Sequence, residues 1–148
     1  MAMQPHSTYR TPSDIYPCVA YEHAHAAIDW LCKAFGFTLQ LMVPDDRDGV
    51  SHAELSLGTG VLMVSSSKPE IRLFPARHPQ GAPVTLSVFV AEPDAHHARA
   101  VAAGARIVSA LRDEEYGARG YGVEDLEGNQ WWFGNYRAGG YWDKPPAT

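Results

Sequence analysis

Cysteine is scarce in this chain. Cys18 and Cys32 are the only two among 148 residues, and they do not form a C-x-x-C pair. Zinc and redox sites built on cysteine use that close spacing, so the sequence offers no such site. We expect one thiol on a strand and one on the following helix, where the pattern favours small buried side chains over a disulfide framework.

Long apolar runs and basic clusters are also missing. No run approaches the roughly 18 apolar residues that a membrane-spanning helix needs. The first twelve residues lack the apolar centre of a signal peptide. The net charge is −5, and Lys and Arg are not clustered on any segment. We therefore expect a cytoplasmic protein with neither a nucleic-acid nor a membrane partner.

What is present is an ordinary globular composition with a repeated order of elements. A strand at 15–21 precedes a helical stripe of Ala24, Ala27, Ile28, Leu31 and Phe35 that ends at Gly36. Strands follow at 37–43, 50–57 and 60–65. After a segment rich in Ser, Pro and Gly, the order restarts with a strand at 84–91, a helix at 93–103 and three more strands.

The restart predicts two copies of one supersecondary unit. Glu22 and Glu92 each precede a helix, and Gly58 and Gly128 each lie in a hairpin turn; both pairs are 70 residues apart. We predict an α+β fold in which two βαβββ modules form a concave mixed sheet, with one helix per module on the convex face. The expected divisions are an arm at 1–14, a single domain at 15–136 (modules 15–65 and 84–136, linker 66–83) and a tail at 137–148.

The densest segment is the predicted hairpin at 116–133. Its turn contains Asp125, Glu127 and Gly128, and the flanking strands carry Arg119, Tyr121, Trp131 and Trp132. Consecutive Trp131 and Trp132 must point to opposite faces of a strand, and we expect Trp132 to face the concave side. If Arg119 lies in a cleft on the concave side, it would anchor an anionic or planar ligand. If it lies on the surface, it would be an ordinary exposed charge.

The segments AAIDWLCKAFGF, HAELSLGTGVLMV, LSVFVAEPDAHHARAVAAGA and YGVEDLEGNQWWFG together resemble the vicinal oxygen chelate superfamily. That superfamily contains glyoxalases, bleomycin-resistance proteins and extradiol dioxygenases. The resemblance covers about 15–136 and is closest to small bacterial glyoxalase-like and bleomycin-resistance-like members. It implies a homodimer, in which a second chain closes exposed strand edges.

The resemblance also implies four equivalent positions where metal-using members place ligands. By counting from the motifs, these positions hold Tyr16, Met63, Thr85 and Trp132. None supplies the imidazole nitrogen or carboxylate oxygen that a divalent ion of this kind prefers. We therefore expect no metal and no other cofactor.

Other polar residues leave alternatives open. His52 and Glu54 lie two apart on one strand face, where they would act as acid and base, bind a polar ligand group, or form a plain charge pair at a sheet edge or dimer contact. His23 and His25 point to different sides of the helix start, so we expect no shared metal there but a surface or capping role. His96 and His97 diverge on the second helix, and we expect them to face solvent.

The main functional hypothesis is a protein that binds a small aromatic or amphipathic molecule in the cleft between its modules or between two chains. One alternative is a metal-dependent lyase or isomerase of glyoxalase type using His52 and Glu54; another is a structural homodimer without catalysis. The predicted pocket residues are Tyr16, Cys18, His52, Glu54, Met63, Thr85, Phe89, Arg119 and Trp132.

Overall fold

A computed structural model of the protein describes residues 13–140 and 142. The first module consists of β1 (Cys18–Ala20), α1 (Ala24–Trp30) with a π-helical continuation η1 (Leu31–Phe35), β2 (Thr38–Pro44), β3 (Val50–Leu57) and β4 (Gly60–Ser65). These strands form a sheet in the order β1-β4-β3-β2. β1 is parallel to β4, and the other pairs are antiparallel.

The second module repeats this arrangement after a short 3-10 turn, η2 (Pro69–Ile71). It consists of β5 (Thr85–Phe89), α2 (Pro93–Ala102), β6 (Arg106–Asp113), β7 (Arg119–Glu124) and β8 (Gln130–Gly134), with sheet order β5-β8-β7-β6. Cys18 pairs with Met63, and Ser87 pairs with Trp132. The predicted α+β fold of two βαβββ modules is confirmed.

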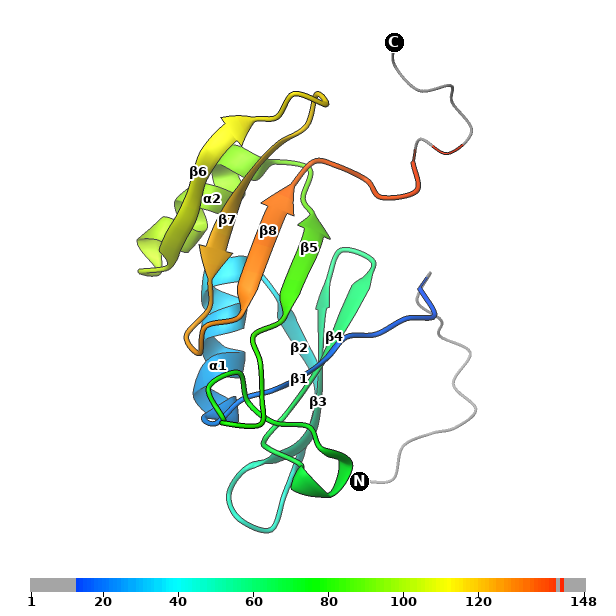
Figure 1. Ribbon diagram of the computed structural model, residues 1–148, viewed down its shortest axis with the longest axis vertical. Coiled ribbons are helices and arrows are strands. Elements are labelled where there is room, and N and C mark those ends of the chain that lie inside the picture. Colours follow the sequence, from blue (N-terminus) through cyan, green and yellow to red (C-terminus); the bar gives the residue numbers. More distant parts are fainter. Residues whose placement is uncertain (1–12, 141, 143–148) are drawn as a thin grey trace.

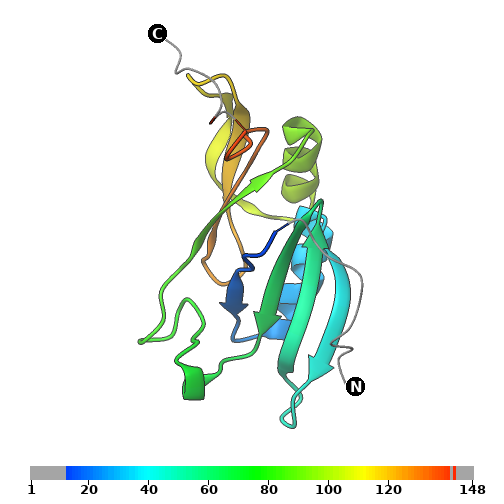
Figure 2. The ribbon, with the colours of Figure 1, turned by 90° about the vertical axis from the view of Figure 1, so that its right-hand side faces the viewer.

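The two sheets face different directions. Figure 1 looks onto one face of the second sheet, with α2 behind it, while the first sheet is seen nearly edge-on. Figure 2 looks onto the first sheet, with α1 behind it. We call the side of each sheet away from its helix the outer face. Within the described residues no strand of one sheet pairs with a strand of the other.

The core lies between the helices and the inner faces of both sheets. Leu31 and Phe35 of η1 are fully buried, as the apolar stripe predicts, and Gly36 ends the turn with a left-handed φ of 84°. The Phe35 ring centroid lies 4.7 Å from that of Phe133 and 5.3 Å from that of Trp131. Since Phe35 belongs to the first module and its partners to the second, aromatic packing joins the modules.

The hairpin turn after β7 makes a second connection between modules. Asp125 is buried, and its carboxylate accepts hydrogen bonds from the Tyr21 hydroxyl at 2.7 Å and from Trp131 Nε1 at 3.0 Å. Glu127 accepts from the backbone N–H groups of Glu22 and His23, at the start of α1. The turn therefore holds the beginning of the first helix in place.

His96 does not lie at the surface as expected. The sequence favoured a surface position, but His96 Nε2 lies 2.8 Å from the Phe35 carbonyl oxygen and Nδ1 lies 2.7 Å from the Tyr121 hydroxyl. Because a carbonyl only accepts, Nε2 carries the proton and Nδ1 accepts from Tyr121. Burial lowers the pKa of His96 against the opposing effect of the bond to Phe35. A neutral imidazole therefore connects α2 to the first module.

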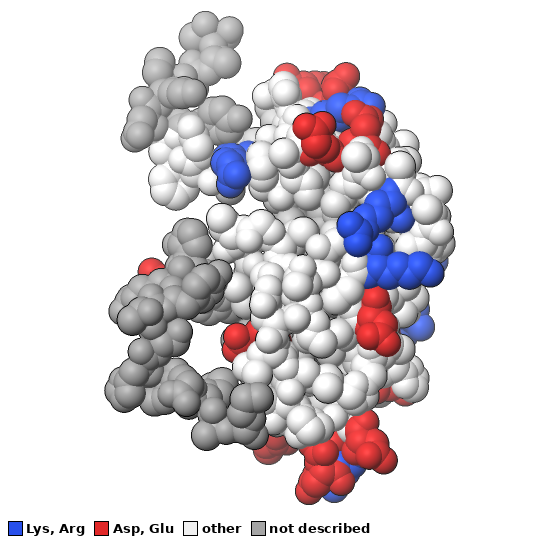
Figure 3. Space-filling view, turned by 180° about the vertical axis from the view of Figure 1, so that it is seen from behind, with Lys and Arg blue, Asp and Glu red and all other residues white. Residues whose placement is uncertain are grey.

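Charge is unevenly distributed on the side opposite to that of Figure 1. Figure 3 shows charged side chains gathered over the α2 and β6 region and at the end formed by the loop 45–48. The surface between them is largely uncharged. It includes the edge strand β2, where Leu39 is 41% and Met42 is 39% exposed.

Candidate ligand-binding site

The outer face of the first sheet carries four of the predicted ligand residues. Cys18 pairs with Met63, Met63 pairs with Glu54, and His52 lies two residues before Glu54 on the same face of β3. Paired residues of neighbouring strands project to the same side. The strand pattern therefore brings these four side chains onto one face. Cys18 is exposed there, in contrast to the buried thiol that the composition favoured.

His52 and Glu54 form the closest polar pair on this face. His52 Nε2 lies 2.7 Å from Glu54 Oε2, and the side chains are 26% and 35% exposed. A carboxylate can only accept, so the proton of this hydrogen bond belongs to Nε2. Nδ1 is then the ring nitrogen available to another group. The carboxylate orients the imidazole, as a general base or a ligand-binding histidine requires.

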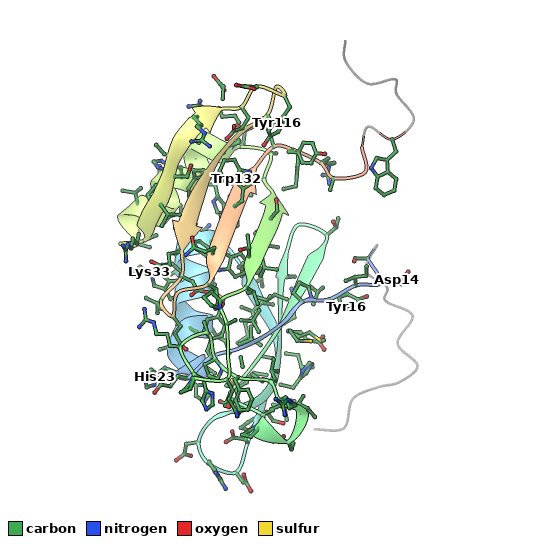
Figure 4. The ribbon with its side chains drawn as sticks, viewed as in Figure 1. Asp14, Tyr16, His23, Lys33, Tyr116 and Trp132 are labelled. Atoms are coloured by element: carbon green, nitrogen blue, oxygen red, sulfur yellow. The ribbon has the colours of Figure 1, made fainter. Side chains whose placement is uncertain are left out.

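The outer face of the second sheet carries Thr85, Phe89 and Trp132. Trp131 is 2% exposed in the core, so the two tryptophans point to opposite sides as alternation requires. The Trp132 indole lies over glycine backbone: a Cβ added to Gly120 would come within 3.0 Å of its ring, and one added to Gly134 within 3.1 Å. Figure 4 shows Trp132 on β8. Glycine at these positions leaves room for an indole against the sheet.

Arg119 does not lie with this group. Gly120 occupies the outer position, so Arg119 points to the helix side, where Nη2 lies 2.9 Å from Asp94 Oδ1 of α2 and Nη1 lies 3.3 Å from Asp113. The hydrogen bond to Arg119 holds the pKa of the Asp94 carboxyl below its usual range. The placement expected from the sequence is wrong, because strand alternation puts glycines rather than Arg119 on the outer face. Arg119 links β7 to α2.

The nine predicted residues therefore do not share one concavity within the chain. Cys18, His52, Glu54 and Met63 lie on the first sheet, and Thr85, Phe89 and Trp132 lie on the second, which faces another direction. Figure 4 shows Tyr16 on the segment before β1, apart from Trp132. The Tyr16 hydroxyl donates to the Ser13 carbonyl at 2.5 Å.

A cleft of about 530 Å³ lies between the modules. The hairpin of β3 and β4 forms one wall and β5 forms the other. Its apolar lining includes Phe37, Leu57, Leu62, Leu86, Val88, Phe89 and Trp131. A volume of this size, with mostly apolar walls, is typical of small-molecule sites.

Arg137 brings a positive charge to this cleft. The Arg137 guanidinium carbon lies 3.8 Å from the centroid of the Phe89 ring, in the geometry of a cation–π contact, and both residues line the cleft. Arg137 falls in the predicted tail at 137–148 and was not among the predicted ligand residues. The structure shows the reason for this placement: β8 runs parallel to β5, and Gly134 pairs with Phe89, so the residues after Gly134 emerge beside Phe89.

The donor chemistry does not fit the metal site of the metal-using relatives. Tyr16, Met63, Thr85 and Trp132 offer neither imidazole nor carboxylate. Glu54, which pairs with Met63, is the one carboxylate among the strand partners of Met63 and Trp132, and it is already bound to His52. Among residues 13–140 and 142 there is no group of three or more His, Cys, Asp or Glu side chains placed to hold a metal ion.

No helix in the described part of the chain has the length and hydropathy to span a membrane.

Comparison with known sequences identifies similar proteins. The family model of the Glyoxalase/Bleomycin resistance protein/Dioxygenase superfamily matches residues 16–133. The uncharacterized protein Mb0911c of Mycobacterium bovis is 32% identical over 121 residues, which are 80% of each chain.

Comparison with solved structures identifies similar folds. TioX from Micromonospora sp. ML1 is 34% identical, with a TM-score of 0.69 over 85% of this chain and 98% of that one. A lactoylglutathione lyase from Agrobacterium tumefaciens shares the fold at 19% identity, with a TM-score of 0.62 over 84% of this chain and 95% of its own.

Proposed function

The chain belongs to the glyoxalase/bleomycin resistance protein/dioxygenase superfamily, and from that premise we propose that it binds a small aromatic or amphipathic molecule, without a metal ion, in the cleft between its modules. The observation that carries this proposal is the apolar cleft of about 530 Å³ between the β3–β4 hairpin and β5. Burial of a flat apolar ligand there gains from area removed from water and from contact with Phe89 and Trp131.

The charge at the cleft favours an acid over a cation. Arg137 already stacks on Phe89, and its guanidinium would pair with a carboxylate while an aromatic ring lies against the apolar walls. Sequestration of a cationic drug, as in bleomycin-resistance proteins, is the less favoured form of this function, since Arg137 would repel the ligand. The formal charge of −5 is spread over the whole chain and does not decide between the two.

Tryptophan fluorescence tests the proposal. Chelator-treated protein is titrated with aromatic carboxylic acids and with cationic glycopeptide drugs. We expect the acids to change the emission with saturation, because Trp131 lines the cleft. Arg137→Gln should weaken acid binding several-fold. Arg112→Gln, which removes an exposed arginine from β6, is the matched control. No saturable response to either set of ligands would contradict the proposal.

A second candidate function is a lyase or isomerase of glyoxalase type. The 2.7 Å contact between His52 and Glu54 favours it, because an oriented imidazole is a competent acid or base. Activity toward a hemithioacetal that chelator abolishes and nickel restores would support this candidate and contradict the first. His52→Gln should then remove the activity, and His25→Gln should leave it unchanged.

A further inference from the structure

A second, separate cavity of about 300 Å³ lies on the first module. The segment 68–73, which we call the strap, forms one side of it. Cys18, His52 and Met63 on the outer face of the sheet line the other side. None of the lining residues also lines the cleft between the modules. The strap cavity is therefore separate from the cleft between the modules, although it shares His52 with the second candidate function.

The strap is held in a fixed shape by its own backbone. Lys68 N–H donates to the Leu73 carbonyl at 2.8 Å, and Leu73 N–H donates back to the Lys68 carbonyl at 3.1 Å. The turn η2 lies between these two bonds, and Arg72 closes it with a left-handed φ of 58°. Non-glycine residues adopt this conformation infrequently. Lys68 and Arg72 are thus carried on a preorganised loop.

The charges facing the strap cavity are mainly positive. Lys68 and Arg72 both line it, and neither forms an ion pair with a carboxylate in the described part of the chain. His52 also lines the cavity. Glu54 is the neighbouring carboxylate, and it is bound to His52; Glu70 belongs to the strap but does not line the cavity. Two unpaired cations beside an apolar wall favour an anion with an apolar body.

We propose that the strap cavity binds a small organic carboxylate. The carboxylate lies between Lys68 and Arg72, where guanidinium geometry allows two parallel hydrogen bonds. The apolar body lies against Met63, Ile71 and Leu73. A volume of about 300 Å³ is at the lower end of the range for ligand pockets and suits a short-chain acid rather than a large ligand.

Cys18 provides a direct reporter of the proposed site. It is exposed and lines the cavity, so its thiolate should be accessible to small alkylating reagents. Iodoacetate carries a charge and iodoacetamide does not, and the same thiolate attacks both. The ratio of the two rates at one cysteine therefore cancels the thiolate fraction and reports the local potential. Cys32 lies outside the cavity and serves as the internal reference.

We expect the iodoacetate-to-iodoacetamide ratio at Cys18 to exceed that at Cys32 by about threefold or more at low salt, and the difference to shrink at high salt. Lys68→Gln and Arg72→Gly should each reduce it; glycine accepts the left-handed φ, so the second variant should keep its fold. Arg47→Gln, which removes an exposed cation outside the cavity, should not. Equal ratios at the two cysteines, or a ratio that neither strap variant changes, would overturn the proposal.

Ligand protection is the second readout. Millimolar hexanoate should slow the iodoacetamide reaction of Cys18 in the wild-type chain, and neutral hexanamide should not. The absence of protection by hexanoate would overturn the proposal. Inorganic phosphate protecting as well as hexanoate would overturn the assignment of a carboxylate with an apolar body, because phosphate uses no apolar wall.

Discussion

Asp125 illustrates how much structure one buried carboxylate can organise. It accepts side-chain hydrogen bonds from Tyr21 and Trp131, and its other oxygen accepts the backbone N–H groups of Glu127 and Asn129, each at 3.0 Å. Burial and the neighbouring Asp125 raise the pKa of the Tyr21 hydroxyl well above its usual value, so the phenol stays a donor. Every partner of the carboxylate is a donor.

Asp125→Asn should therefore be strongly destabilising despite its similar shape. The amide replaces an acceptor by a donor that faces other donors, and buried groups lose their partners. We expect the free energy of unfolding to fall by about 2–4 kcal/mol in urea denaturation. Asp46→Asn, at an exposed loop position, is the control and should change it little. If Asp125→Asn were as stable as Asp46→Asn, the turn after β7 would not join the modules.

His96 predicts a pH dependence of stability. Its pKa in the folded state is lowered, while an unfolded imidazole titrates near pH 6.5. Between these two pKa values the unfolded chain binds more protons than the folded chain. The contribution of His96 to the free energy of unfolding is therefore complete above about pH 6.5 and falls as the pH drops below that value. His96→Gln should flatten the pH profile of unfolding free energy between pH 7 and pH 5. His25→Gln, at an exposed position, should keep the wild-type slope; an unchanged slope in both variants would contradict the assignment.

At the scale of elements, strand alternation was readable from the sequence. It correctly assigned His52 and Glu54 to one face, and Trp131 and Trp132 to opposite faces, because the two-residue period of a strand is local. Arg119 was misplaced because its face depends on the register with β8, where Trp132 pairs with Gly122. The helix 93–103 was predicted, but the inward position of His96 depends on Phe35, which is 61 residues away.

The relative orientation of the sheets was not predictable for the same reason. It is fixed by contacts between distant segments, such as Tyr21 with Asp125 and Phe35 with Phe133. None of these pairs has a spacing that a local pattern reveals. Counting along strands assigns each residue to a face of its own sheet. It therefore could not show whether the predicted pocket residues of the two modules share one concavity.

The two adjacent tryptophans of β8 provide a matched pair of variants. Trp131→Ala removes a buried ring that packs on Phe35, Phe37 and Phe133, and should lower the unfolding free energy by about 3–5 kcal/mol. Trp132→Ala removes a partly exposed ring on the outer face and should cost about 1 kcal/mol or less. Thermal and urea denaturation measure both. Equal losses would show that the face assignment is wrong.

At the scale of the whole molecule, the outer faces of both sheets are left uncovered by the helices. The edge strand β2 of the first sheet carries no charged residue between Thr38 and Pro44. The corresponding edge strand of the second sheet, β6, carries Arg106, Arg112 and Asp113. Charge is a common protection for an exposed edge. We propose that a second copy of the chain covers the β2 side, which would also bring additional modules near the outer faces.

Light scattering tests the oligomeric state. We expect a dimer at micromolar concentration, and Met42→Glu in β2 should shift it toward monomer because a charge would enter an apolar contact. Val101→Glu introduces the same charge at an exposed position on α2, where Val101 is 49% exposed, and should leave the dimer intact. A wild-type chain that stays monomeric would contradict the dimer.

The most direct test of ligand binding without a metal is a map of amide chemical shifts in chelator-treated, nitrogen-15-labelled protein titrated with 2-naphthoate. We expect saturable shifts concentrated at residues 57–62 and 86–91, the two walls of the cleft, and the loss of these shifts in Phe89→Ala. Shifts that avoid both walls, or binding that appears only after nickel is added, would contradict it.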